Sequence, residues 1–293
     1  MKAVDFDYVC PTSVGKTCEW LRASDGDAKI IAGGQTLVPL LAMRLARPTL
    51  LVDINRIAEL QGIEADDDRV SVRSCTRQAA ALADETIRRR LPLLAKALGF
   101  VGHGQTRNRG TIGGSLANAD PAAEICLVAL ALDAEIDACS AEGSRTIAAG
   151  EFFAGAMTTA LAVDECLTIV HFPLWRENRV GTGFQETSGR RSDFALAAVA
   201  TQVAFDAAGV CRRLVLGIGG AGATPLRVEA AVDRLLGSRL EASDIAAAAG
   251  IVREAVEPAS DLHGSAAYRR RLIGALVERA LTEARQEALA AGA

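Results

Sequence analysis

The stretch IIAGGQTLVPL, residues 30–40, places two adjacent glycines and a glutamine between two apolar runs. The first run belongs to AKIIAGG, residues 28–34, which has the short apolar and β-branched pattern of a buried strand. Glycine directly after a strand permits positive φ and lets main-chain N–H groups approach a ligand with no Cβ in the way, as in phosphate-binding turns. A single Gly-Gly pair is also an ordinary tight turn, and taken alone this pair favours that structural interpretation.

A second stretch, TRNRGTIGGSLANADPAAE, residues 106–124, repeats the same chemistry. Its glycines stand beside two hydroxyl side chains: Gly110, Gly113, Gly114, Thr111 and Ser115. Two such turns could hold one diphosphate from both sides, so their joint presence favours ligand binding over two unrelated turns. We expect a bulky residue at Gly33 or Gly114 to block that approach in a chain that still folds.

A third glycine stretch, GIGGAG at 217–222, matches G-x-G-x-x-G and follows the apolar run RRLVL. A dinucleotide-binding fingerprint opens directly into a helix within a βαβ unit. Here Pro225 delays any helix to about Arg227. We therefore interpret GIGGAG as a strand end followed by a turn.

The composition, 293 residues with 50% hydrophobic and a formal charge of −4, indicates a chain with a substantial core and no basic block for nucleic acid. No apolar run reaches the length of a membrane span, and the N-terminal MKAVDFDYVC lacks the pattern of a secretory signal. We expect a cytoplasmic protein with no integral membrane segment and no nucleic-acid partner.

The seven cysteines are scattered, and none forms a C-x-x-C pair. This pattern predicts reduced thiols and argues against an iron–sulfur cluster or zinc site held by this chain alone. The three histidines lie far apart in the sequence. We assign no catalytic residue and no metal ligand, because no Ser-His-Asp or Cys-His arrangement follows from the spacings.

The pattern along the chain predicts mixed α and β structure. Strands are expected at 49–54 and 69–75, and a short helix at 14–24. Residues 76–98 have a helical pattern that Pro92 should divide into two helices. Residues 125–139 could be a helix running into a strand, and residues 194–220 alternate like an antiparallel hairpin that turns at Ala208 and Gly209.

Helices are also expected at 241–256 and 264–289, the latter with a core-facing stripe formed by Tyr268, Leu272, Leu276 and Ala280. The polar, glycine-containing stretch PLWRENRVGTG, residues 173–183, marks the main domain boundary. We expect one domain at 1–176, with parts at about 1–57 and 58–176, and a second at 177–293.

Four segments carry a resemblance to a known family: AGGQTLVPLLAMRLARPTLLVDINRI at 32–57, RNRGTIGGSLANADPAAE at 107–124, GRRSDFALAAVA at 189–200 and GGAGATPLR at 219–227. The chain resembles the FAD-binding medium subunits of molybdenum hydroxylases over nearly its whole length. That family includes aerobic carbon monoxide dehydrogenase, the xanthine dehydrogenase type and bacterial dehydrogenases of nicotine and other N-heterocycles.

The resemblance implies an α+β fold: a two-part FAD-binding domain of the vanillyl-alcohol-oxidase type, then a C-terminal domain with a three-stranded antiparallel sheet and helices. It also implies cofactor-binding residues, with main-chain amides of the first motif contacting the FAD diphosphate and an acidic residue contacting its adenosine end. These positions are Ile31, Ala32, Gly33, Gly34, Gln35, Thr36, Leu37, Val101, Thr111, Ile112, Gly113, Gly114, Ser115, Asn118, Glu124, Leu161 and Gln185.

The implied function is electron transfer in a complex. A large molybdopterin-binding subunit would hydroxylate an N-heterocycle, an aldehyde or CO, and a small subunit with two [2Fe-2S] clusters would pass the electrons to the FAD of this chain. The implied assembly is a dimer of heterotrimers. Two alternatives stay open from the sequence: a stand-alone flavin-dependent dehydrogenase or oxidase, and a non-catalytic nucleotide-binding subunit.

Three positions depart from the pattern common among these relatives. Gln185 stands where many have Lys, Asn118 where the carbon monoxide dehydrogenase branch has His, and Phe194 where some have Tyr. The missing cation at Gln185 leads us to expect that Gln185→Lys changes the reduction potential of the flavin.

Overall fold

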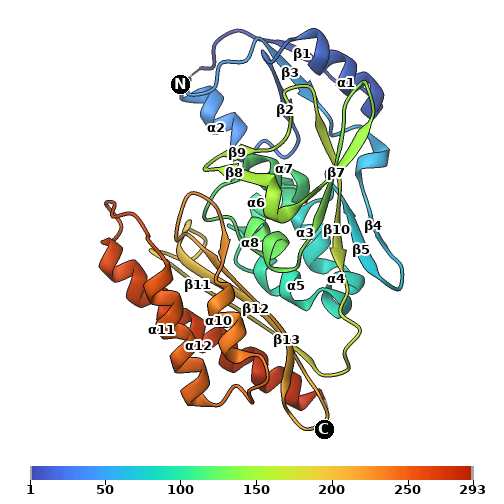
Figure 1. The fold of residues 1–293 in the computed structure, drawn as a ribbon. Coiled ribbons are helices and arrows are strands. Elements are labelled where there is room, and N and C mark those ends of the chain that lie inside the picture. The colour runs from blue at the N-terminus through green and yellow to red at the C-terminus, as the bar shows by residue number, and fades with distance from the viewer. Residues whose placement is uncertain (1, 292–293) are drawn as a thin grey trace.

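Three larger sheets follow one another along the computed structural model, which describes residues 2–291 (Figure 1). The first is a parallel sheet with strand order β1-β3-β2. Ser13 starts the first helix by accepting a hydrogen bond from the main-chain N–H of Lys16. The elements of this part are β1 (Asp7–Val9), α1 (Val14–Ala23), β2 (Ala28–Ile31), α2 (Leu37–Ala42), β3 (Leu50–Asp53) and the 3-10 helix η1 (Ala58–Leu60).

The second sheet is antiparallel, with order β4-β5-β10-β6-β7, and helices cover one of its faces. Pro92 occupies the first turn of a helix, which confirms the predicted break, and Asp84 caps another helix and adds a break that was not predicted. The elements are β4 (Ile63–Ala65), β5 (Arg69–Arg73), α3 (Gln78–Ala83), α4 (Glu85–Arg90), α5 (Pro92–Leu98), α6 (Gly104–Arg109), α7 (Ile112–Asn118), α8 (Glu124–Ala131), β6 (Glu135–Cys139), β7 (Ser144–Ala148), α9 (Ala149–Phe152), β8 (Phe153–Gly155), β9 (Thr158–Thr159) and β10 (Cys166–Pro173).

The third sheet is antiparallel with order β11-β12-β13-β14, so the three long strands that were predicted gain a short fourth at the edge. The predicted hairpin is confirmed as β12 and β13, and GIGGAG is a strand end and turn. The elements are β11 (Val180–Ser188), β12 (Ala195–Phe205), β13 (Cys211–Gly219), β14 (Leu226–Arg227), α10 (Glu229–Leu235), α11 (Ala242–Ala255) and α12 (Ala266–Ala290).

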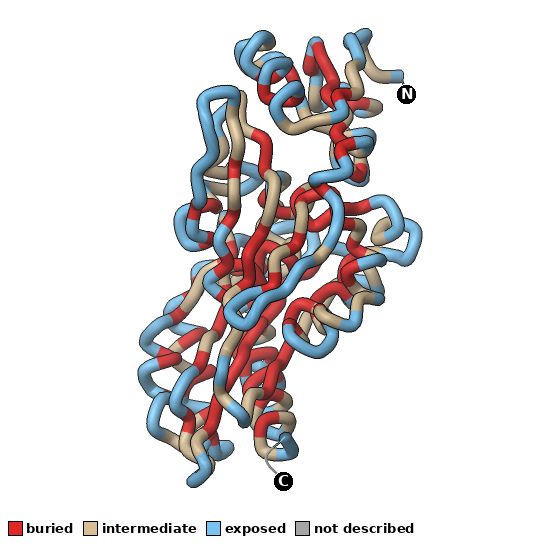
Figure 2. The backbone as a smooth tube through the Cα atoms, turned by 90° about the vertical axis from the view of Figure 1, so that its right-hand side faces the viewer, coloured by how far each residue is buried: buried red, intermediate tan, exposed pale blue. Residues whose placement is uncertain are grey.

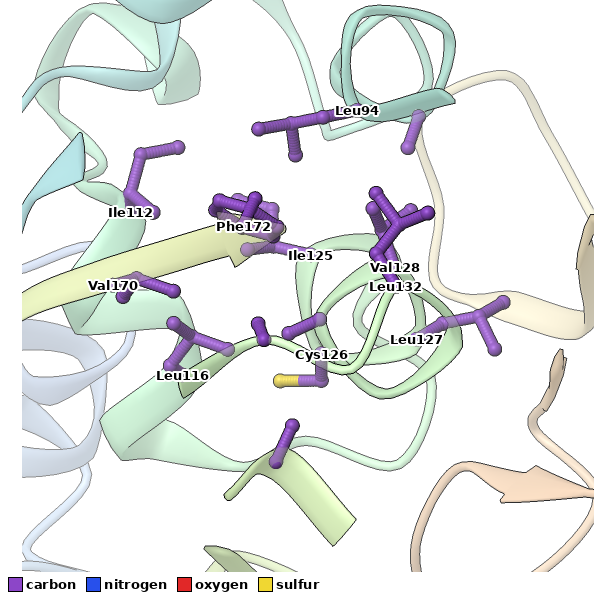
Figure 3. Packing of buried hydrophobic residues seen from close by; sticks show 14 of the residues in the cluster. Leu94, Ile112, Leu116, Ile125, Cys126, Leu127, Val128, Leu132, Val170 and Phe172 are labelled. Carbon is purple, nitrogen blue, oxygen red and sulfur yellow. The ribbon is translucent and has the colours of Figure 1, made fainter. Parts of the chain in front are cut away.

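The largest apolar cluster lies between the second and third sheets. Figure 3 shows its central residues from α5, α7, α8 and β10, with Phe172 and Ile125 near the middle. Residues of β11 and β12 belong to the same cluster, including Phe184 and Ala198. Buried residues of the second part and of the third sheet therefore belong to one cluster, and Figure 2 shows buried segments in both parts.

Glycines let helices approach both faces of the third sheet closely. A Cβ at Gly217 would lie 2.9 Å from Cδ1 of Leu127 in α8, so this glycine makes room for that side chain. On the other face, a Cβ at Gly183 would lie 2.0 Å from the carbonyl oxygen of Ala280 in α12. Gly217, the first glycine of the GIGGAG stretch, thus allows α8 to pack closely on the third sheet.

The stripe predicted for the last helix is only partly buried. Leu276 and Ala280 are buried and Leu272 is half-buried, but Tyr268 is 41% exposed. The buried line begins one residue later, at Arg269, which donates a hydrogen bond to the carbonyl oxygen of Leu196 in β12, and it continues at Ile273. Predicting Tyr268 as a core residue was wrong.

Candidate functional site

The two predicted glycine turns meet in space. The first turn connects β2 to α2, and the second lies between α6 and α7. A Cβ built on Gly33 would stand 2.5 Å from the carbonyl oxygen of Arg109 and 2.9 Å from Cα of Gly110. Glycine is therefore needed at position 33 mainly because the main chain of the second turn packs directly against it and leaves no room for a Cβ.

The first turn presents a run of main-chain donors. Gly34 has φ +70°, a conformation that favours glycine. In the described chain, the main-chain N–H groups of Gly33, Gly34, Gln35 and Thr36 donate to no protein atom. Burial decreases along the run, from the buried Gly33 to the exposed Gln35 and Thr36. Successive amides without protein acceptors, at the end of a strand, form the kind of concavity that binds phosphate oxygens.

The second turn does not repeat this arrangement. Its amides at Ile112 and Gly113 donate to the carbonyl oxygens of Thr76 and Ser74, over 3.0 and 2.9 Å. The amide of Gly114 donates to the hydroxyl oxygen of Thr111, which caps α7. The expectation that both turns offer main-chain donors is wrong for these three amides, because Thr76, Ser74 and the Thr111 hydroxyl of the turn itself already accept their hydrogen bonds.

Polar groups of other kinds are available in the second turn. Within residues 2–291, the hydroxyl of Ser115 donates to no protein atom. Asn118, at the end of the same helix, has its amide 3.7 Å from the sulfur of Met157. α7 also packs on β9, the strand just before Leu161, and Leu161 packs on the large apolar cluster. These predicted positions therefore lie on elements that contact one another.

Val101 lies beside a polar cavity of about 270 Å³. Arg107 donates to the carbonyl oxygens of Val101 and Gly102, over 2.8 and 2.7 Å, and so holds this bend of the chain. The cavity opens where the bend meets the β11–β12 loop, and its lining is Gly99, Gly102, His103, Gly104, Arg107, Arg191 and Ser192. Its cationic lining suits an anionic or strongly polar ligand group.

Glu124, the first residue of α8, is half-buried close to a second carboxyl group. Burial raises the pKa of Glu124 to about 7, and the charge of Asp120 acts in the same direction. Burial likewise raises the pKa of Glu186 in β11 to about 8, and the charge of Glu124 adds to this effect. Oε2 of Glu186 is buried without a hydrogen-bond partner in the described residues.

Gln185 contacts the last helix, and its described hydrogen bond involves neither glycine turn. Its side-chain amide donates to Glu283 of α12 over 2.8 Å. The other carboxylate oxygen of Glu283 binds Lys96 of α5 over 2.7 Å. Because side chains alternate along a strand, Gln185 faces α12, whereas Glu186 faces the second part of the chain.

Asn55 and Arg77, which were not among the predicted positions, contact the glycine turns. Asn55 lies within the first family-like segment and is polar immediately after a strand, which is a usable signal, whereas nothing local distinguishes Arg77. The side chain of Asn55 donates to the carbonyl oxygen of Ala32, and Arg77 donates both to Asn55 and to the carbonyl oxygen of Arg109. Both residues therefore touch the glycine turns from behind.

A Ser-His-Asp array occurs elsewhere, although no such arrangement was expected from the spacings. Ser71 lies 2.7 Å from Nδ1 of His171, whose Nε2 lies 3.0 Å from Asp137. The three residues occupy the neighbouring strands β5, β10 and β6. The first two strands are paired on both sides, so their amides serve the sheet and offer no oxyanion hole. The array is a cross-strand polar ladder.

The described residues were also compared with the requirements of a metal site and of a membrane-spanning helix. Among residues 2–291, no cluster of three or more His, Cys, Asp or Glu side chains could hold a metal ion. The helices in this range include none that is both long and apolar enough to cross a bilayer.

Comparison with known proteins identifies the class to which this fold and these turns belong. Residues 4–175 match the family model described as the FAD binding domain in molybdopterin dehydrogenase. Residues 183–284 match the CO dehydrogenase flavoprotein C-terminal domain. The chain belongs to this family of FAD-binding subunits of molybdenum hydroxylases, and the expected cofactor class and fold class are confirmed.

Individual relatives agree over the full length. The chain is 42% identical to the 6-hydroxypseudooxynicotine dehydrogenase complex subunit alpha of Paenarthrobacter nicotinovorans, covering 97% of this chain and 96% of that one. The crystal structure of quinoline 2-oxidoreductase from Pseudomonas putida 86 superposes with a TM-score of 0.94 at 35% identity, covering 99% and 100%. Carbon monoxide dehydrogenase from Hydrogenophaga pseudoflava gives 0.94 at 33% identity, covering 98% and 99%. These relatives favour neither the stand-alone enzyme nor the non-catalytic subunit.

Proposed function

We propose that this chain is the FAD-carrying, electron-transferring subunit of a heterotrimeric molybdenum hydroxylase whose substrate is an N-heterocycle or a related compound. The observation that carries the proposal is the run of free amides from Gly33 to Thr36, packed against the second glycine turn. The substrate class rests on the relative named for 6-hydroxypseudooxynicotine and on the neighbour named for quinoline.

The residues present fit an FAD diphosphate. Four successive donors at 33–36 supply hydrogen bonds to phosphate oxygens, and Arg107 and Arg109 in the neighbouring turn supply positive potential. Ser115 offers a further hydroxyl donor, and Glu124 offers an acceptor at the adenosine end, as the family resemblance implies. The site residues predicted from the sequence, apart from Gln185, are proposed to form this cofactor site.

Bound FAD would supply a carrier that can accept electrons singly and release them in pairs. In the proposed complex the hydroxylation itself belongs to another subunit. The contribution of this chain is to bind and orient the cofactor and to set the electrostatic field around it. In the proposed complex, a large subunit holds molybdopterin, a small subunit holds two [2Fe-2S] clusters, and two heterotrimers pair in the cytoplasm. The scattered thiols of this chain are consistent with clusters that reside on a partner.

The test is cofactor analysis of the purified native complex. We expect the visible spectrum to contain flavin bands, the flavin released from this chain to be FAD by chromatography, and iron–sulfur absorbance to separate with another subunit. A colourless chain that cannot be reconstituted with FAD would overturn the proposal. FAD in an isolated chain that itself oxidises an N-heterocycle would favour the stand-alone enzyme.

A further inference from the structure

A hydrogen-bonded pair of side chains joins the two glycine turns from behind. Nδ2 of Asn55 donates to the carbonyl oxygen of Ala32 over 2.8 Å, at the start of the first turn. Nη2 of Arg77 donates to Oδ1 of Asn55 over 2.7 Å, and Nη1 of Arg77 donates to the carbonyl oxygen of Arg109 in the second turn. One asparagine and one arginine thus connect the main chains of both turns.

Asn55 is itself held in place by the strand that precedes it. Oδ1 of Asp53 accepts hydrogen bonds from the main-chain and side-chain N–H groups of Asn55, over 2.8 and 2.6 Å. Oδ2 of Asp53 accepts a hydrogen bond from the hydroxyl of Tyr8 in β1. The pair is therefore fixed to the first sheet, and each side-chain bond of Asn55 has a defined direction.

These contacts set the direction of a donor in the proposed diphosphate site. In a trans peptide the carbonyl and the N–H point in opposite directions. Holding the Ala32 carbonyl towards Asn55 therefore turns the N–H of Gly33 the opposite way. Holding the Arg109 carbonyl towards Arg77 fixes the edge of the second turn against which Gly33 packs, with no room for a Cβ between them.

We propose that Asn55 and Arg77 are positioning residues for FAD: they fix the separation and orientation of the two glycine turns, and so set the affinity for the cofactor. Neither residue needs to touch FAD. The inference rests on the proposed function, and it adds residues outside the set predicted from the sequence.

The test compares Asn55→Leu and Arg77→Met with Arg73→Met as a matched control. Arg73 is half-buried on β5 and, like Arg77, donates to one carbonyl oxygen and one side chain, those of Glu59 and Glu64. Its partners lie outside both glycine turns. Each variant complex is freed of FAD and titrated with FAD by flavin fluorescence, and the melting temperature of the FAD-free form is measured alongside.

We expect Kd for FAD to rise about tenfold or more in Asn55→Leu and Arg77→Met, since the first loses three side-chain hydrogen bonds and the second two, and to change less than about threefold in Arg73→Met. The melting temperatures of FAD-free Arg77→Met and Arg73→Met should fall by similar amounts. Arg77→Lys, which keeps one donor, should lie between wild type and Arg77→Met. This graded affinity is a readout that general destabilisation does not produce.

If both Asn55→Leu and Arg77→Met bind FAD as tightly as Arg73→Met, the inference is overturned and the proposed function stands. If the wild-type complex itself takes up no FAD, the proposed function fails and the inference fails with it. Should Arg77→Met not fold, Arg77→Lys and Asn55→Ser decide the question, since wild-type affinity in both overturns the inference and weakened affinity in both supports it.

Discussion

The carboxyl pair Glu124 and Glu186 should make this chain less stable as the pH rises. Both pKa values are raised in the folded chain, to about 7 and about 8, against an ordinary value of 4.5. Between these limits the folded state holds protons that the unfolded state has released. The stability that these two protonated carboxyl groups contribute is therefore fully present below pH 4.5. It is lost as the pH rises through the folded-state pKa values.

The magnitude follows from the proton difference. Near pH 6 an unfolded carboxyl is ionised and both folded ones are protonated, so the limiting slope is about 2.7 kcal/mol per pH unit for two protons. Both groups are half-buried, and solvent screening brings their folded pKa values closer to 4.5. The two states then differ by fewer than two protons, and the slope is about 1–2 kcal/mol per unit. Glu186→Gln removes one of the two titrating groups and should lower the slope to about half.

The assay is urea unfolding of the isolated FAD-free chain at several pH values between 5.5 and 7.5. Glu186→Gln should be more stable than wild type at pH 7.5, and the difference should shrink towards pH 5.5. Glu151→Gln, at an exposed position on α9, serves as the control and should follow wild type throughout. Equal slopes for wild type and Glu186→Gln would refute the reasoning.

Three further predictions concern the turns and the contact between parts. Gly33→Ala should destabilise the FAD-free chain by about 1–3 kcal/mol, measured by urea unfolding, because its Cβ would overlap the main chain at Arg109; an unchanged midpoint would contradict the close packing. Lys96→Met should lower the free energy of unfolding by about 1–3 kcal/mol in the same assay, because it leaves Glu283 and Glu287 without their cation. Adding Glu283→Gln to Lys96→Met should recover part of this loss. Gln185→Lys should leave the flavin reduction potential within error of wild type in a redox titration, because the side chain at this position contacts Glu283 and not the turns; a shifted potential would show the opposite.

Local sequence patterns were enough to predict much of the fold. The strand before Gly33, the helix that begins at Pro92 and the β12–β13 hairpin all follow from short-range rules on glycine, proline and alternation. The interpretation of GIGGAG as a turn also rested on local evidence, the position of Pro225. These features need no knowledge of which distant segment packs on which.

The remaining features depend on such distant contacts. Whether the amide of Gly113 is free depends on the carbonyl of Ser74, which another segment supplies. Gly33 is constrained by the main chain of Arg109, a pairing that no sequence period encodes. Whether Gln185 or Glu186 faces α12 depends on strand register, because a shift of one residue moves a side chain to the other face of the sheet.

The first glycine turn and the second belong to different apolar clusters. The strand before the first turn, β2, and its neighbour β3 pack in a small cluster around Cys18 and Val52, whereas α7 lies in the large cluster that extends into the third sheet. A ligand that binds both turns would couple the opening of the small cluster to that of the large one. Cofactor loading should therefore govern how readily a protease reaches the N-terminal part, and cleavage there would report occupancy of the site in a cell extract.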